Sequence, residues 1–211
     1  MAIESDCLLY DARVPNALKI IRKSSFTAQP WKNAAGITHE AIRVPPDGDS
    51  FLWRVSVAHI DASGPFSDFA GFNRNMVLLR GSGLALNFGH GEQRVLRQIG
   101  DLAQFDGAVG TQCELLNGPC VDLNFMVSKS LRTDVRIERV SEGLSVHASE
   151  SKSILIVGIE EPLMLNLGAG ESEQLEPWDL AVLSAGSARV SKPEPNKASA
   201  PSAVFFATIY H

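Results

Sequence analysis

Residues 76–89 read M-V-L-L-R-G-S-G-L-A-L-N-F-G, two apolar runs joined by a Gly-Ser-Gly turn. Short runs rich in Val, Leu and Phe that are bounded by glycine are typical of buried β-strands joined in a hairpin. A similar stretch, S-I-L-I-V-G-I-E-E-P-L-M-L-N-L-G, occupies residues 153–168. Both stretches end on L-x-L-N, an apolar residue and glycine, so the chain carries two copies of one hairpin signal.

The segments that follow the two hairpins are also alike. The first copy continues with I-G-D-L-A-Q-F from residue 99 and closes with V-D-L-N-F-M-V from residue 121. The second copy continues with P-W-D-L-A-V-L from residue 177 and closes with A-V-F-F-A-T-I-Y from residue 203. Similarity on this scale indicates two copies of one supersecondary unit. Chance likeness among short strands remains the alternative.

Strand signals dominate the whole chain, and helical patterns are nearly absent apart from a short turn near residues 66–69. Apolar runs are separated by Gly, Pro, Asn and Asp at intervals of about 8–12 residues, as in sandwiches and barrels. A hairpin, an acidic turn and a returning strand are the elements of a cupin barrel. We therefore predict an all-β bicupin, two jelly-roll-like β-barrel halves in one compact chain. The halves are residues 15–128, with the expected ligand pocket, and 129–211. The expected strands are 17–22, 37–44, 51–58, 75–80, 83–88, 93–98, 102–105, 111–116, 120–127, 134–140, 144–147, 153–158, 162–167, 171–175, 180–183, 187–191 and 203–210.

The composition excludes several classes of function. A net charge of −5 and the lack of any Lys/Arg block make nucleic acid an unexpected partner. No apolar run approaches the roughly 20 residues that span a bilayer, and the acidic N-terminus does not resemble a signal peptide. The three cysteines, Cys7, Cys113 and Cys120, show no C-x-x-C spacing. This usage favours a reducing compartment, so we expect a cytoplasmic protein without a membrane partner.

The histidines argue against the metal site that most cupins use. Such a site needs two closely spaced histidines, a carboxylate and a later histidine. The chain has no H-x-H pair, and we therefore expect neither a metal nor another cofactor; its histidines are His39, His59, His90, His147 and His211.

Two strand candidates carry polar residues at buried positions. In F-L-W-R-V-S-V, from residue 51, alternation places Arg54 and Ser56 on one face. In V-D-L-N-F-M-V, Asp122, Asn124 and Met126 share a face. A buried charge is costly unless something pairs with it. Three explanations stay open. The face of Arg54 and Ser56 points outward and is solvated, or Arg54 pairs with Asp122, or both charges line a pocket and hold a ligand.

Further polar residues lie on expected loops beside these strands. W-K-N-A-A-G-I-T begins at Trp31 and includes Lys32 and Asn33, and Arg74 follows G-F-N. Loops on a rigid barrel are where ligand groups collect. Two or three cations and an amide suit a small carboxylate, because guanidinium binds carboxylate through a bidentate fork. Trp31 and Phe66 are candidates for an apolar wall, or for ordinary core positions.

These motifs, in this order, resemble the HutD/Ves family. The resemblance rests on W-K-N-x-x-G-I-T, W-R-V-S-V-A, G-P-F-S-D-F-A-G-F-N-R, G-x-G-L-x-L and G-P-C-V-D-L-N-F-M, and it is most specific over residues 31–127. It implies a bicupin without the metal-binding histidines, associated with bacterial histidine utilisation. The implied role is to bind a pathway metabolite, such as N-formylglutamate or a related intermediate, and to restrain pathway flux. The implied pocket residues are Trp31, Lys32, Asn33, Arg54, Ser56, Arg74, Asp122, Asn124 and Met126.

One departure from the family lies next to this pocket. The family's Gly-Gly-Gly turn stands here as Ala34-Ala35-Gly36, and two Cβ atoms restrict positive φ angles. The shape of this loop and the identity of the ligand therefore stay open.

The expected function is a metal-free sensor that binds a small acidic metabolite. One alternative is a metal-independent isomerase or hydrolase, with Asp122 as general base and Lys32 or Arg54 holding charge. Another is a purely structural polar set in a protein that acts through a protein interface. A homodimer through edge strands stays open as well.

Overall fold

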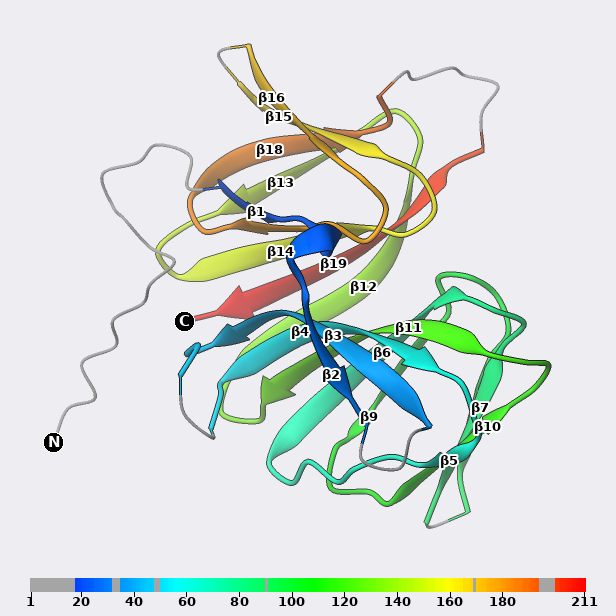
Figure 1. The fold of residues 1–211 in the computed structure, drawn as a ribbon. Helices are drawn as coiled ribbons and strands as arrows, with labels where there is room; N and C mark the ends of the chain where they lie inside the picture. Colours follow the sequence, from blue (N-terminus) through cyan, green and yellow to red (C-terminus); the bar gives the residue numbers. More distant parts are fainter. Residues whose placement is uncertain (1–17, 32–34, 48–49, 90, 169, 194–199) are drawn as a thin grey trace, which may run out of the picture.

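Four β-sheets form two halves in the computed structural model, which describes residues 18–31, 35–47, 50–89, 91–168, 170–193 and 200–211. Figure 1 shows the halves one above the other. In the first half, a six-stranded sheet has the order β2 (Thr27–Pro30), β3 (Gly36–Val44), β4 (Trp53–Ile60), β11 (Cys120–Ser128), β6 (Phe72–Arg80) and β9 (Leu102–Asp106). A four-stranded sheet faces it, in the order β5 (Gly64–Pro65), β10 (Thr111–Leu115), β7 (Leu84–Phe88) and β8 (Gln93–Leu96).

The second half has the same construction. Its five-stranded sheet has the order β1 (Leu18–Ile21), β17 (Leu180–Leu183), β14 (Lys152–Gly158), β19 (Ser202–Tyr210) and β12 (Arg132–Val140). Its four-stranded sheet has the order β13 (Leu144–Ala148), β18 (Gly186–Ser191), β15 (Leu163–Gly168) and β16 (Glu171–Leu175).

The strand orders confirm the repeat and the bicupin. The run β4-β11-β6-β9 of the first half recurs as β12-β19-β14-β17, and β5-β10-β7-β8 recurs as β13-β18-β15-β16. Counted along the chain, each strand of the second half comes eight strands after its counterpart in the first half. The acidic turns match too: Asp101 accepts a hydrogen bond from the backbone N–H of Gln98 (2.9 Å), and Asp179 accepts one from that of Glu176 (3.2 Å). The chain is therefore two jelly-roll copies, each with a carboxylate that fixes the turn before a returning strand.

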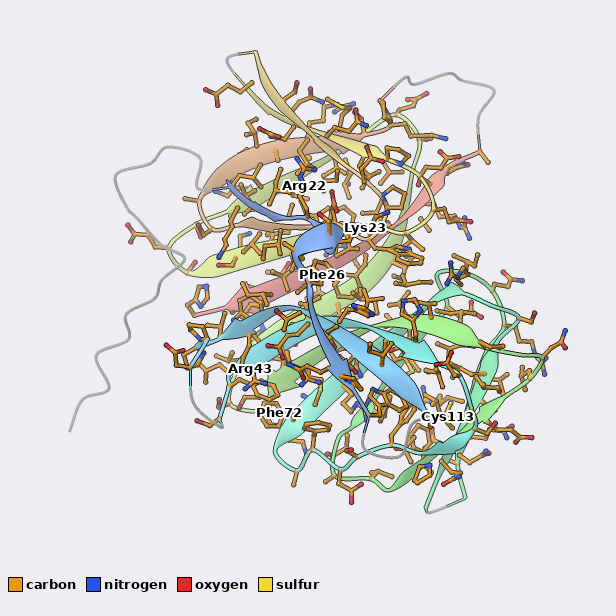
Figure 2. All side chains as sticks on the ribbon, viewed as in Figure 1. Arg22, Lys23, Phe26, Arg43, Phe72 and Cys113 are labelled. Atoms are coloured by element: carbon orange, nitrogen blue, oxygen red, sulfur yellow. The ribbon has the colours of Figure 1, made fainter. Side chains whose placement is uncertain are left out.

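Every expected strand is present within a few residues of its expected bounds, and β2 and β5 are additional. The expected division of the chain needs one correction, at β1. This strand falls inside residues 15–128, but it pairs with β17 of the second half. A 3-10 turn, η1 (Lys23–Ser25), then carries the chain to the first half, as Figure 2 shows at Lys23 and Phe26. The Arg22 guanidinium anchors this crossing by donating a 3.0 Å hydrogen bond to buried Asp179.

No α-helix occurs in the described ranges, and residues 66–69 form an irregular loop. Over the same ranges, the search for a helix long and apolar enough to cross a membrane finds none.

The packing explains the two faces of the central strands. Val55 and Val57 of β4 and Leu123 and Phe125 of β11 are buried against the large sheet of the second half, where the Phe125 ring lies 6.1 Å from that of Phe205. The alternate residues of β4 and β11 face the four-stranded sheet of their own half. Burial of one face thus fixes the register, and the polar residues that the alternation places together on the other face turn inward.

Candidate functional site

A cavity of about 540 Å³ lies inside the first half, in the size range of small-molecule pockets. Three adjacent strands, β4, β11 and β6, supply its polar floor. In this sheet Asn124 stands between Ser56 and Met76, and Met126 stands between Arg54 and Arg74. The cavity is lined by Gln29, Pro30, Trp31, Thr38, Arg54, Ser56, Ala58, Pro65, Phe66, Ser67, Phe69, Arg74, Met76, Asp122 and Asn124.

Arg74 is the most deeply buried cation of the site, with 5% of its surface exposed. Its guanidinium carbon lies 5.2, 5.7 and 5.1 Å from the ring centroids of Phe66, Phe69 and Phe105. Its Nη1 donates a long hydrogen bond, 3.5 Å, to the carbonyl oxygen of Ser67, and its Nε has no partner among the described residues. Burial lowers the pKa of Arg74 to about 10, although the nearby Asp122 opposes this. The guanidinium therefore has donors to offer inside an aromatic cage.

Asp122 lies on the same floor and is 1% exposed. Neither carboxyl oxygen has a hydrogen-bond partner within the part of the chain that the structure describes. Burial raises the pKa of Asp122 to about 7, and the charge on Arg74 acts in the opposite direction. Near neutral pH this carboxyl is therefore divided between its acid and its anion, so it can donate or accept a hydrogen bond.

Arg54 does not form the pair with Asp122 that the sequence left open. Its Nη1 lies 3.7 Å from Oε2 of Glu40, and its Nη2 donates to Sδ of Met126 at 3.4 Å. The guanidinium also lies over the ring of Phe51, at 5.5 Å. Burial lowers the pKa of Arg54, and the Glu40 carboxylate partly restores it. Arg54 thus enters the cavity with a counter-ion already beside it.

Ser56 and Asn124 add two more polar atoms to the floor. Oγ of Ser56 and Oδ1 of Asn124 are buried without a partner among the residues described. Together with the Asp122 oxygens they form a row of acceptors along neighbouring strands. The floor therefore has guanidinium donors at one end and acceptors at the other.

Two aromatic rings, those of Trp31 and Phe66, form part of the cavity lining. Nε1 of Trp31 donates a 2.8 Å hydrogen bond to Oγ1 of Thr38, and its ring meets that of Phe66 edge-on at 6.0 Å. Gly36 permits this arrangement, because a Cβ atom there would lie 2.3 Å from the carbonyl oxygen of His59 and 3.3 Å from the Trp31 ring. The glycine of the W-K-N-A-A-G motif is thus explained by close packing.

The structure gathers six of the nine expected pocket residues around the cavity: Trp31, Arg54, Ser56, Arg74, Asp122 and Asn124. Met126 lies behind Arg54 and contacts it through sulfur. Lys32 and Asn33 lie outside the described residues, as do His90 and Ala34.

Sequence reasoning missed Thr38, Phe69 and Glu40. Phe69 stands three residues after Phe66 in the G-P-F-S-D-F segment, which was a usable signal. Thr38 lies in the same motif as Trp31, but their contact joins β3 to the residue that follows β2. No sequence pattern predicted that Glu40 lies beside the cavity, because its orientation depends on a β-bulge in β3.

In the second half, the positions that correspond to Asp122 and Asn124 are apolar. By strand order and register, Asp122 and Asn124 of β11 correspond to Val204 and Phe206 of β19. Both of these apolar residues are completely buried in the core of the second half. The jelly roll therefore does not require polar groups at these positions.

Comparison with known proteins links the chain to one family. The family model described as HutD matches residues 23–199. An uncharacterised 21.2 kDa protein in the hutC 3' region of Pseudomonas putida is 31% identical over 163 residues, which cover 77% of this chain and 84% of that protein.

Two solved structures resemble the whole molecule. A conserved protein of unknown function from Pseudomonas aeruginosa PAO1 has a TM-score of 0.80 at 29% identity, covering 92% of this chain and 99% of that one. HutD from Pseudomonas fluorescens SBW25 has a TM-score of 0.75 at 26% identity, covering 92% of this chain and 100% of that one.

Proposed function

Because the chain belongs to the HutD family, we propose that it binds a small carboxylic acid of histidine utilisation and so senses or restrains that pathway. N-formylglutamate or a related intermediate is the proposed ligand, bound without a metal. One observation carries the proposal. The Arg74 guanidinium is almost completely buried on a cavity wall, and it donates one long hydrogen bond to a backbone carbonyl.

The Arg74 guanidinium lacks a strong hydrogen-bond acceptor among the described residues. A buried charge costs several kcal/mol unless hydrogen bonds or an opposite charge offset its desolvation. Phenylalanine rings offset part of this cost, but they accept no strong hydrogen bonds. A carboxylate fits the planar fork of a guanidinium and supplies two acceptors at once. A carboxylic acid in the cavity would therefore remove the largest unmet requirement of the site.

The hydrogen-bond acceptors on the floor indicate a second chemical group that the ligand should carry. Asp122, Asn124 and Ser56 present oxygens that no described residue meets. A ligand that carries an N–H group away from its carboxylate would satisfy both ends of the floor. In N-formylglutamate the formamide N–H is separated by three carbons from the side-chain carboxylate, so the two groups can reach opposite ends of the floor.

The second half supports a ligand role over a structural one. The positions of Asp122 and Asn124 are filled there by valine and phenylalanine, which bury well. The polar residues thus make the first half less stable than it could be, as expected where binding rather than packing determines a site.

A second candidate function is favoured by Asp122 alone. A buried carboxyl on a cavity wall with a pKa of about 7 suits a general acid or base at neutral pH. This corresponds to the metal-independent isomerase or hydrolase. Product formed from N-formyl-L-glutamate by the purified protein, and not by the Asp122→Asn variant, would favour the enzyme over the sensor.

Thermal unfolding with histidine-pathway acids tests the proposal. Ligand at 100 times its Kd stabilises the folded state by about 2.7 kcal/mol, which raises Tm by several degrees. We expect this shift for the wild type and not for Arg74→Met. Arg94→Met is the matched control, because Arg94 is an exposed arginine on β8 that pairs with Glu92.

Two results would contradict the proposal. If no acid of the panel raises the Tm of the wild type, the protein does not bind this class of ligand. If Arg74→Met keeps the full shift while the control behaves like the wild type, the acid binds at another place.

A further inference from the structure

Asp122 and Arg74 line the same cavity without a hydrogen bond to each other. Both oxygens of the buried Asp122 carboxyl lack a partner among the described residues. The Arg74 guanidinium donates instead to the carbonyl oxygen of Ser67, at 3.5 Å. The register of β11 and β6 explains this, because Arg74 stands opposite Met126, four residues along the strand from Asp122. A ligand in the cavity can therefore reach both groups.

Most titratable groups that face Asp122 keep one charge state near neutral pH. Arg74 faces it from β6, and a pKa of about 10 keeps this guanidinium charged. Arg54 faces the cavity from β4 and is likewise a cation there. Cys113 lies on β10 of the facing sheet and Cys120 on β11 itself. Burial raises the pKa of Cys113 to about 12 and also raises that of Cys120, so both thiols stay neutral.

The remaining groups leave Asp122 as the one that titrates inside the cavity, among the described residues. Asp68, in the loop before β6, acts on Arg74 and favours its charged form. His39 and His59 belong to the same sheet, but register and alternation place them on the face toward the second half. Burial raises the pKa of Asp122 to about 7, against the charge on Arg74. A proton can therefore enter or leave the cavity floor near neutral pH.

A ligand carboxylate at Arg74 changes the conditions at Asp122. It brings a negative charge into a cavity that already holds a buried carboxyl, and like charges repel appreciably in such a place. It also occupies donors of the guanidinium whose charge favours the ionised form of Asp122. Both effects favour the neutral carboxyl. When two acids share one site, one of them tends to keep its proton.

We propose that the site takes up its acid together with one proton from the solvent, which Asp122 holds and offers as a hydrogen bond while Arg74 holds the carboxylate. This inference rests on the proposed function and adds to it how the site responds to pH. A neutral carboxyl has an O–H that donates and a C=O that accepts. It therefore matches a formamide, which offers both a C=O and an N–H. An ionised Asp122 would present acceptors only.

The affinity for the acid should fall as pH rises through the range in which the free site loses its proton. Below this range the proton is already in place, so binding does not depend on pH. Above it, every ligand that binds must draw a proton from the solvent. We expect the Kd of N-formyl-L-glutamate to rise roughly tenfold from pH 7 to pH 8.5 and to change little from pH 5.5 to pH 6.5.

Titration calorimetry in buffers of different ionisation enthalpy counts the protons. With N-formyl-L-glutamate we expect most of one proton per ligand at pH 8 and almost none at pH 6. Asp122→Asn should take up no proton and bind with a similar Kd at both pH values, because an amide does not titrate. Asp134→Asn is the matched control and should behave like the wild type. Asp134 is an exposed residue of β12 in the second half, where it pairs with Arg136.

The outcomes separate the inference from the proposed function. If the wild type binds the acid at pH 8 without proton uptake, or if Asp122→Asn takes up as many protons as the wild type, Asp122 does not hold the proton and the inference fails. If N-formyl-L-glutamate binds at neither pH, the proposed function fails for this acid and the inference falls with it.

Infrared difference spectra decide the case in which Asp122→Asn does not bind. With aspartate labelled by ¹³C, the wild type should gain the C=O band of a protonated carboxyl when the acid binds at pH 8. Asp134→Asn should show the same band. Binding by the wild type without this band would overturn the inference.

Discussion

Replacing Asp122 by asparagine should remove a pH-dependent part of the protein's stability. The side chain is completely buried, neither carboxyl oxygen has a hydrogen-bond partner within the described ranges, and its pKa in the folded protein is about 7. The usual value in an unfolded chain is about 3.8. Between these two values the unfolded chain releases the proton while the folded protein keeps it. The wild type therefore loses stability as pH rises from about 4 to 7 and reaches a plateau above 7.

The magnitude follows from the separation of the two pKa values. Each unit between them changes the free energy of unfolding by about 1.4 kcal/mol. From pH 5 to pH 8 only the part below the folded pKa counts, which is about two units and therefore about 3 kcal/mol. Because Asp122 is fully buried, solvent screening does not reduce this figure. Asparagine has the same shape and does not titrate, so the variant lacks this contribution.

Urea unfolding of the wild type and Asp122→Asn at pH 5, 6, 7 and 8 measures the effect. Other titrating groups are common to both proteins, so the difference between the two free energies isolates Asp122. We expect the variant to gain about 3 kcal/mol on the wild type between pH 5 and pH 8. A difference that stays constant over this range would show that Asp122 is already ionised in the folded protein, and the reasoning from burial would fail.

Three further predictions concern the cavity and its surroundings. Arg74→Met should raise the free energy of unfolding without ligand by about 1–3 kcal/mol, because it replaces a buried, poorly bonded charge by an apolar chain; urea unfolding measures this. Gly36→Ala should lower the Tm and weaken acid binding, since the new Cβ would lie 2.3 Å from the carbonyl oxygen of His59; an unchanged Tm would contradict the close approach. Burial raises the pKa of Cys113 to about 12. In a Cys7→Ser, Cys120→Ser background this thiol should therefore resist DTNB at pH 8 until urea unfolds the protein, and rapid reaction in the folded state would contradict that.

The faces of the central strands could be predicted because alternation is a local property. Once Val55 and Phe125 are assigned to a core, Arg54, Ser56, Asp122 and Asn124 must share the other face. The two hairpin copies likewise predicted two equivalent jelly rolls, because turn residues and apolar runs repeat along the chain. The family motifs pointed to the same residues.

The aromatic cage around Arg74 could not be predicted from the sequence. Phe66 and Phe69 come from an irregular loop, and Phe105 comes from β9. No period in the sequence relates these positions to Arg74. Their convergence is decided by how the two sheets of the half pack, which is a long-range outcome. The same holds for β1, whose pairing with β17 depends on contacts about 160 residues apart along the chain.

Turn residues and apolar runs are local signals, and they were enough to predict two jelly-roll copies with polar residues gathered on one face of the first. The way in which those charges are compensated depends on contacts between strands. Arg54 pairs with Glu40 because a bulge turns Glu40 to its face, and Arg74 and Asp122 remain without ion-pair partners among the described residues. The two properties depend on the chain over different distances. Side-chain orientation follows a period of two residues along one strand, whereas an ion pair depends on a few ångströms across strands, and a single extra residue changes which groups meet.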